Sequence, residues 1–593
     1  MFELLERGGL GRLAILTRGD RTLRTPAVLF VHRGSRPSPA YAEALFASER
    51  VPDPRLQFRV SGSLFSPRRL ESTDDLPPTK GLPRSAADLD VPQGAAAGDL
   101  AVVTSRADLD AAKESDVVFL GNGVEYLRHP RDFAADLAHV RETLGPAKAI
   151  AVTGLAAPSN LAGLVYAGVD LVDSSRLRIE SAQGSFHTSD GAWPADQVDR
   201  SSCGCEACAA GADVGVHNDL ALHREMLLVR NHLAHGRLRD LVERRLSNDP
   251  WNTQVLRHLD LRHETVLEEY APVVGEPLLA YSHASLTRPE VLRFRRRVRE
   301  RYARPPSARV LLLLPCSARK PYSRSRSHRR FRDAILACGR PSVVHEVVVT
   351  SPLGLVPREL ERVFPAGAYD IPVTGDWSRD EAAAVTDDLR AFVAANPYDA
   401  IVAHLAAEAP IVRAALPGAV VPSEEPPTSD GALERLTKVL DDATGSFERV
   451  PAGRRFAEEM TNIARFQFGP PGVDLLAGAT FRGRLPDVRV LRDGVQLAAH
   501  TARGMLSLTL DGGRILSKVD AHCVEIDDFV PKGNVFAVGV TGASAGIRVG
   551  DEVVVRHQGD VRAVGTAWMN GREMADCRRG EAVHVRHVLA PEA

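Results

Sequence analysis

Short apolar runs that alternate with helical patterns dominate the first 245 residues. Such runs occur at Leu100–Val103, Val117–Leu120 and Ala149–Val152, and again at 169–172. Strands that alternate with helices indicate parallel βαβ units. This many units in one region favour a (β/α)8 barrel.

The pattern changes along the rest of the chain. A helical stretch is followed by a second alternating region with strands at 310–314, 343–349 and 400–405, which predicts a small doubly wound sheet. After residue 446, short strands and glycine turns predict β-rich modules without long helices. Because 593 residues are too many for one core, we expect a multidomain α/β protein divided at 1–245, 246–306, 307–445, 446–517 and 518–593.

Composition narrows the class of protein. With 44% apolar and 25% charged residues, the chain is typical of globular proteins. No run approaches the ~18 apolar residues of a membrane helix, and the N-terminus lacks a signal-peptide layout, so we expect a cytoplasmic protein. Seven cysteines are too sparse for a disulfide framework. The net charge of −2 means that any nucleic-acid partner is held by local basic patches.

One such patch is an amphipathic helical stretch within 246–306. Val291, Phe294, Val298 and Tyr302 recur at helical spacing. Seven arginines occupy the remaining positions: Arg293, Arg295, Arg296, Arg297, Arg299, Arg301 and Arg304. This pattern is equally typical of a solvated helix face and of a surface that contacts RNA phosphates.

Chemically active residues are concentrated at 315–328, directly after an apolar strand. The segment contains Cys316, Lys320, Tyr322 and His328. In open α/β sheets, ligands bind beyond the carboxyl ends of strands, and a cysteine crowded by cations is a candidate reactive thiolate. The alternative is a connecting loop with a structural cysteine. The surrounding Arg319, Arg324, Arg326, Arg329 and Arg330 favour phosphate contact.

A second constellation has metal-ligand spacing. Cys203, Cys205 and Cys208 place three thiols within six residues, and tetrahedral Zn²⁺ with a Cys₃His set needs one histidine more. A helix is predicted over 220–246, and His232 lies at the edge of its apolar stripe. We therefore favour His232 as the fourth ligand, with His217 and His223 as weaker alternatives.

The metal motif resembles the zinc site of tRNA-guanine transglycosylases, (β/α)8 barrels that exchange a guanine in tRNA for a 7-deazaguanine. The segments 154–158 and 168–173 are similar to the part of that family that carries the nucleophilic aspartate, which places Asp173 at that position. The family's motif D-S-G-[GS]-F-Q corresponds here to 60–65, where Val60 replaces the essential aspartate. The resemblance thus implies a degenerate, tRNA-binding barrel with a zinc subdomain.

The segment 315–328 resembles the core motif of archaeosine synthases at every fixed position, namely Pro315, Cys316, Lys320, Pro321, Tyr322, Ser325 and His328. The segments 351–360 and 369–377 are also similar to that family. The stretches 536–540, 548–553, 564–565 and 579–583 resemble a PUA domain, a small RNA-binding pseudo-barrel, at the C-terminal end.

This resemblance implies an enzyme that adds an amine to the nitrile of 7-cyano-7-deazaguanine at position 15 of tRNA. The nitrogen donor is free lysine, whose adduct a radical-SAM partner enzyme cleaves, or glutamine; lysine is favoured because no glutaminase apparatus is recognisable. Cys316 would be the nucleophile, with its pKa lowered by nearby cations. Lys320 would stabilise charge, His328 would shuttle protons, and Tyr322 and Ser325 would orient the reactants.

Further residues are expected to contact the substrate: Asp173, Arg319, Ser351 and Asp376. An alternative chemistry keeps Cys316 structural and has the amine attack directly. Two alternative functions are base exchange by the barrel, against which Val60 argues, and a non-catalytic tRNA-binding scaffold, against which the intact motif argues. The oligomeric state is open, with a homodimer among the candidates.

Overall fold

The computed structural model describes two compact units, one formed mainly by residues 1–271 and the other mainly by 272–593. Short C-terminal segments, 536–538 and 572–580, group with the first unit. The described residues are 2–32, 37–47, 50–61, 95–96, 100–121, 123–372 and 375–589. Of the segment 60–65, only Val60 and Ser61 lie within them, at the end of a strand. The loop expected around 66–98 lies outside them, except for Ala95–Ala96.

The first unit is built on an eight-stranded sheet in which seven strands are parallel and β7 is antiparallel. Its strands are continuous apolar runs such as Val117–Leu120, as expected for parallel strands buried on both faces. The order is β7 (Ala95–Ala96), β6 (Leu56–Ser61), β5 (Ala44–Ala47), β4 (Ala27–Val31), β11 (Leu171–Asp173), β10 (Ala149–Val152), β9 (Val117–Leu120) and β8 (Leu100–Val103).

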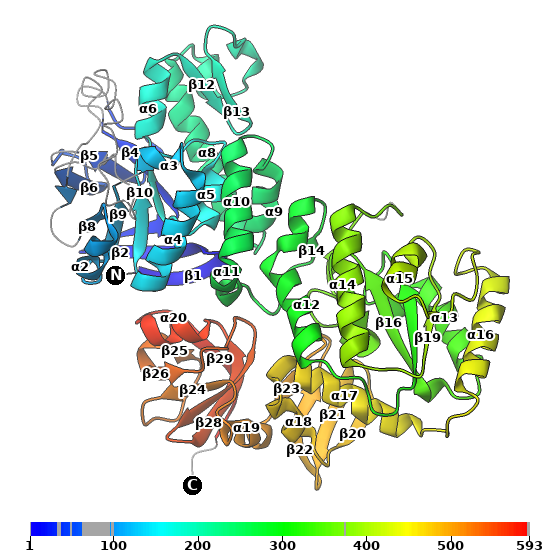
Figure 1. The fold of residues 1–593 in the computed structure, drawn as a ribbon. Helices are drawn as coiled ribbons and strands as arrows, with labels where there is room; N and C mark the ends of the chain where they lie inside the picture. Colours follow the sequence, from blue (N-terminus) through cyan, green and yellow to red (C-terminus); the bar gives the residue numbers. More distant parts are fainter. Residues whose placement is uncertain are drawn as a thin grey trace. The chain divides into compact units, whose positions relative to one another are not determined.

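The barrel prediction is confirmed in its coarser form. The sheet is curled like half a barrel, but β7 and β8 form its two edges and no ladder joins them in the described part of the chain. An additional antiparallel sheet comprises β1 (Phe2–Gly8), β2 (Gly11–Arg18) and β3 (Arg21–Thr25). Helix α10 (Pro250–Arg262) packs against α4 (Pro130–Leu144) and α5 (Leu161–Tyr166), which lie beside the large sheet in Figure 1.

The cysteine-rich part of this unit contains the hairpin β12 (Ser185–Thr188) and β13 (Gly191–Pro194), the short helix α7 (Glu206–Ala209) and the long helix α8 (Val214–Ala234). The single helix predicted over 220–246 is in fact two. Helix α8 starts earlier because the Asp213 side chain caps it by accepting a hydrogen bond from the amide of Gly215. It ends before Gly236, whose φ of +64° is left-handed, and α9 (Leu238–Arg245) follows.

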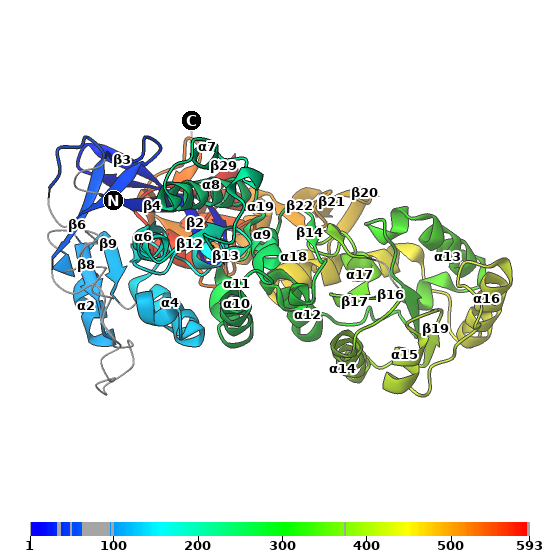
Figure 2. The ribbon, with the colours of Figure 1, turned by 90° about the horizontal axis from the view of Figure 1, so that it is seen from above.

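The second unit contains a four-stranded sheet in the order β17 (Gly354–Pro357), β16 (Val344–Thr350), β15 (Val310–Pro315), β19 (Ala400–Ala403). Strands β16, β15 and β19 are parallel. Alternate residues of β15 enter different cores, one lined by α13 (Arg326–Ala337) and α16 (Asp430–Thr444), the other by α12 (Pro289–Arg301) and α14 (Arg379–Ala395). Helices therefore cover both faces, as the doubly wound prediction requires (Figure 2).

The prediction of no long helices after 446 is wrong. Helix α17 (Ala452–Phe468) contributes Met460, Ile463 and Phe466 to the core, and α18 (Pro471–Leu476) follows it. The β-rich part begins with a four-stranded sheet. Its order is β20 (Thr480–Arg484), β21 (Asp487–Arg492), β22 (Val495–His500) and β23 (Leu506–Leu508).

The last strands form a six-stranded sheet after helix α19 (Leu510–Ser517). Its order is β25 (Val535–Phe536), β29 (Glu581–Val588), β28 (Asp560–Ala567), β27 (Glu552–His557), β24 (Cys523–Ile526) and β26 (Val540–Ala543). Among the described residues, no helix has both the length and the apolar character needed to span a membrane.

Several arginines of α12 contact neighbouring elements of the same unit. Arg295 and Arg299 both pair with Asp388 on α14, and the guanidinium of Arg297 lies 5.8 Å from the ring centroid of Phe466. Arg293 and Arg297 are buried. This stretch thus joins α12 to its neighbours, which favours a structural role over phosphate contact.

Candidate active site at the carboxyl edge of the small sheet

Three parallel strands that are adjacent in the sheet end at one pocket, and each is followed by a polar residue that lines it. Cys316 directly follows β15, Ser351 directly follows β16, and Glu408 lies in the loop after β19. Because parallel strands share the edge at which they end, these residues meet in the crevice where α/β sheets bind ligands. The expected placement of Cys316 is therefore observed.

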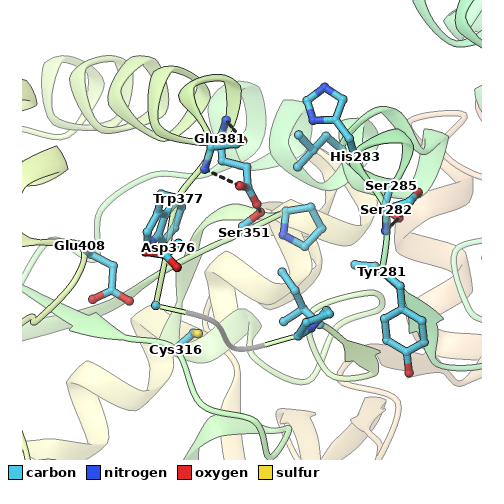
Figure 3. A pocket seen from close by; sticks show the side chains of 17 residues that line it. Tyr281, Ser282, His283, Ser285, Cys316, Ser351, Asp376, Trp377, Glu381 and Glu408 are labelled. Atoms are coloured by element: carbon cyan, nitrogen blue, oxygen red, sulfur yellow. Dashed lines mark hydrogen bonds between the residues drawn. The ribbon is translucent and has the colours of Figure 1, made fainter.

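The pocket has a volume of about 300 Å³. Its other walls come from 280–286, which precede α12, and from 375–381, which lead into α14 (Figure 3). The charged or ionisable groups on these walls are His283, Asp376 and Glu381. With Glu408, the described residues of the lining include three carboxylates and no lysine or arginine. Electrostatically, it favours a cationic ligand over an anionic one.

The environment of Cys316 raises the pKa of its thiol. Burial is the main cause, followed by the negative charge of Glu408. A hydrogen bond with Thr350 and the charge of Lys320 act in the opposite direction but do not prevail. The expected lowering of this pKa by a nearby cation, Lys320, is present but is outweighed by burial and Glu408. The thiol therefore needs a proton acceptor to become nucleophilic.

Lys320 acts electrostatically on the Cys316 thiol but does not line the pocket. Its Nζ is 3.9 Å from the ring centroid of Tyr369 and, in the described part of the chain, has no hydrogen-bond partner. Burial lowers the pKa of this amine, while the charges of Cys316 and Asp370 oppose that shift. An ammonium held without a hydrogen bond beside Cys316 suits stabilisation of negative charge.

Tyr322 is fully buried and belongs to a chain of hydroxyl groups. Its Oη is 2.8 Å from Oη of Tyr369, which is in turn 2.6 Å from Oγ1 of Thr350. Since Thr350 hydrogen bonds with Cys316, this chain connects Tyr322 to the Cys316 thiol from within the core. The structure does not bring its side chain to the pocket lining.

Ser325 and His328 shape the loop that carries Cys316. The Ser325 side chain caps α13 by accepting a hydrogen bond from the amide of His328. The buried ring of His328 lies with Nε2 2.9 Å from the carbonyl oxygen of Pro315 and Nδ1 2.8 Å from the guanidinium of Arg358. Burial and the Arg358 charge lower the pKa of His328 to about 3.

These contacts correct the role expected of His328. Arg358 can only donate, so Nδ1 accepts and Nε2 must carry the hydrogen given to Pro315. A ring with both nitrogens occupied and a pKa near 3 is a poor proton shuttle at neutral pH. His328 instead anchors the residue that precedes Cys316.

The predicted substrate-binding residues are only partly brought together. Ser351 and Asp376 line the pocket, and Oγ of Ser351 donates a hydrogen bond of 2.5 Å to Glu381. Arg319 is exposed and lies outside the lining. Asp173 belongs to the other compact unit.

Asp173 ends strand β11 and is fully buried. Its Oδ1 accepts hydrogen bonds of 3.0 Å from the amides of Gly154 and Ser175, while its Oδ2 has no hydrogen-bond partner in the described part of the chain. Burial raises the pKa of this carboxyl to about 6. A half-satisfied buried carboxylate is more typical of a functional position than of a structural one.

The cysteine cluster is completed by His217. Its Nδ1 lies 3.7, 3.3 and 3.5 Å from the Sγ atoms of Cys203, Cys205 and Cys208, and the four ligand atoms lie within 4.8 Å of one another. The His217 Nε2 is 2.9 Å from the carbonyl oxygen of His187, which orients the ring. Three thiols and one imidazole fit tetrahedral Zn²⁺.

The choice of His232 as the fourth ligand is corrected. His232 lies near the end of α8. Its Nδ1 is 2.9 Å from the carbonyl oxygen of Leu228, and its Nε2 is 2.7 Å from the guanidinium of Arg244 on α9. The physical reason is the early start of α8, which puts His217 in the first turn, beside the cysteines.

Sequence reasoning missed Glu408, Glu381 and the wall at 280–286. Glu408 carried a usable signal, since it closely follows the predicted strand at 400–405. The segment 280–286 carried no such signal. It precedes α12, outside the alternating α/β pattern, and only the tertiary fold brings it to the pocket.

Comparisons with known proteins agree with this architecture. A family model described as a domain of unknown function, DUF5591, matches 291–440, and a PUA domain model matches 523–589. An archaeosine synthase from Haloferax volcanii is 36% identical over 99% of both chains. The archaeosine synthase subunit alpha of Methanosarcina acetivorans is 36% identical over 80% of each chain. A tRNA-guanine(15) transglycosylase from Methanobrevibacter smithii is 23% identical over 73% of this chain and 65% of its own.

The fold, the pocket and the C-terminal match define a multidomain protein that carries a PUA domain and has transglycosylase relatives. At 36% identity across nearly its full length, the chain belongs to the archaeosine synthase family.

Proposed function

We propose that this protein acts in archaeosine biosynthesis by adding an amine to the nitrile of 7-cyano-7-deazaguanine at position 15 of tRNA. The observation that carries the proposal is the Cys316 thiol, which lies in a pocket at the carboxyl edge of the small sheet. Family membership supports the tRNA pathway, and the PUA domain supports an RNA substrate.

A thiol suits this reaction because sulfur adds readily to the electrophilic carbon of a nitrile. Attack by Cys316 forms a carbon–sulfur bond and yields a thioimidate. The amine then adds to the same carbon and releases the thiol, which leaves an amidine on the base. The buried ammonium of Lys320 stabilises negative charge on sulfur during both steps.

The charge of the pocket favours lysine as the donor. Asp376, Glu381 and Glu408 line it, and carboxylates in a partly buried site attract an ammonium group. Free lysine carries two ammonium groups, whereas glutamine carries one and would need a separate hydrolytic site to release ammonia. We infer that the acidic lining receives the lysine, whose adduct a radical-SAM partner enzyme then cleaves.

The zinc ion that we assign to Cys203, Cys205, Cys208 and His217 has a structural role in this scheme. All four ligand positions are filled by protein groups, which is typical of closed structural sites. The ion would tie the start of α8 to the cysteine loop.

The test is to incubate the protein with tRNA bearing 7-cyano-7-deazaguanine, offering lysine and glutamine separately. Digested nucleosides are then weighed by mass spectrometry. A product with the mass of the nitrile nucleoside plus one lysine supports the proposal. Direct amidine formation from glutamine would change the donor, and tight tRNA binding with no mass change with either donor would contradict nitrile amination. Cys316→Ser is the matched inactive variant.

A further inference from the structure

Proton transfer in this pocket needs a group other than His328. Nucleophilic attack by Cys316 releases a thiol proton, and the nitrile nitrogen must gain one. His328 has both ring nitrogens engaged, with Pro315 and Arg358. Lys320 does not line the pocket, so it is not placed to give a proton to a nitrile nitrogen bound there.

Glu408 is the candidate for this step because it lines the same pocket as Cys316 and its charge acts on the thiol. It comes from the loop after β19, the strand adjacent to β15, and lines the same pocket as Cys316. Figure 3 shows Glu408 and Cys316 on the same side of the pocket. Only 8% of the Glu408 residue is exposed, and its charge acts on the thiol strongly enough to be the second cause of the Cys316 pKa shift.

The other ionisable groups near the thiol are hydrogen-bonded to other residues or, in the case of Asp376, exposed. Glu381 accepts hydrogen bonds from Ser351 and from the amide of Ser378. The Tyr322 and Tyr369 hydroxyls bond to each other, and burial raises the pKa of both. Asp376 is exposed, on the segment that leads into α14. Burial also raises the pKa of Glu408, toward the range useful for proton exchange.

We propose that Glu408 is a catalytic residue that carries the Cys316 thiol proton to the nitrile nitrogen. The proposal rests on the proposed function. As the sulfur–carbon bond forms, the S–H proton passes to the Glu408 carboxylate and one carbon–nitrogen π bond opens. The protonated carboxyl then donates to that nitrogen, which completes the thioimidate and restores the carboxylate. No oxidant, reductant or further reactant is needed.

This role predicts two opposite effects of Glu408→Gln. Loss of the proton carrier slows the formation of the covalent protein–tRNA complex, measured without amine donor on denaturing gels, by about a hundredfold or more. Loss of the negative charge lowers the thiol pKa, so alkylation of Cys316 by iodoacetamide at pH 8, followed on the Cys316 peptide, becomes about two- to tenfold faster. A merely structural role predicts no such split.

Glu408→Asp keeps a carboxyl and should recover part of the rate, which also covers the case in which the glutamine variant folds poorly. Glu434→Gln, on the exposed face of α16, is the charge-matched control and should behave as wild type in both assays. Full complex formation by Glu408→Gln would overturn the proposal. If wild type itself forms neither complex nor adduct, the proposed function fails, and the alkylation comparison still reports whether Glu408 acts on the thiol.

Discussion

Arg358 donates a hydrogen bond of 2.8 Å to Nδ1 of His328, and this contact determines that Nε2 is the ring nitrogen that carries the hydrogen. Arg358 is itself held by Glu346 and Glu361 at 2.6 and 2.8 Å. The imidazole is thus a neutral donor to the carbonyl oxygen of Pro315, the residue directly before Cys316.

His328 should make the protein sensitive to acid without titrating near neutrality. Its pKa is about 3 in the folded state and near 6.5 when unfolded. The unfolded state therefore binds the extra proton between these values, and stability falls as pH drops below about 6.5. For this ring the loss between pH 7.5 and pH 5 is about 2 kcal/mol. Urea unfolding of wild type and His328→Gln at both pH values tests this, and equal pH dependence would contradict the neutral ring.

Cys316 should react slowly with alkylating agents at neutral pH. Burial and Glu408 raise its thiol pKa, so the thiolate fraction at pH 7.5 is below that of a free cysteine and rises with pH. The rate of iodoacetamide labelling of the Cys316 peptide between pH 7 and 10 measures this. Lys320→Met should slow the labelling further, because it removes the charge that favours the thiolate. Fast labelling at pH 7 would show that the thiol is activated before substrate binds.

The purified protein should contain about one zinc ion per chain, which Cys205→Ser and His217→Ala lose. Removing a ligand from a four-ligand site leaves an open, weaker site. Metal analysis after dialysis against a mild chelator gives the stoichiometry. His232→Ala is the matched control and should retain zinc, since its ring contacts Leu228 and Arg244 instead. Zinc loss only in the His232 variant would reverse the assignment.

Glu381→Gln should raise KM for lysine by about tenfold while changing kcat less. The carboxylate lines the pocket and accepts a hydrogen bond from Ser351, so its charge is available to bind an ammonium rather than to move a proton. Steady-state kinetics with lysine as the varied substrate separates the two parameters. An unchanged KM would place the amine elsewhere.

Asp173→Asn should stabilise the protein at pH 7.5. The folded pKa of about 6 lies above the unfolded value, near 3.9. The folded state therefore binds the extra proton, and stability falls as pH rises through 6. Because asparagine does not ionise, the substitution should raise the free energy of unfolding by about 1–3 kcal/mol at pH 7.5 and by less at pH 4.5. Thermal unfolding of wild type and Asp173→Asn at both pH values measures this difference in stability. Destabilisation at pH 7.5 would mean that the carboxylate has a partner when charged.

Several features of this protein follow from local sequence. Three thiols within six residues can meet one ion whatever the fold around them, and an apolar strand followed by Cys316 places that residue at a sheet edge. The apolar runs of the first region and of 307–445 likewise predict strands that are buried on both faces, because parallel strands need no alternation.

The tertiary structure decided the rest, because the deciding contacts join residues that are distant in sequence. The fourth member of the Cys₃His cluster depended on where Asp213 starts α8. The chemistry of His328 depended on Arg358, thirty residues away. Glu408 lines the same pocket as Cys316 because β19 pairs with β15. A residue's identity sets which protons and bonds it can exchange. Burial and the charges that the fold places beside it set which of these it exchanges at neutral pH.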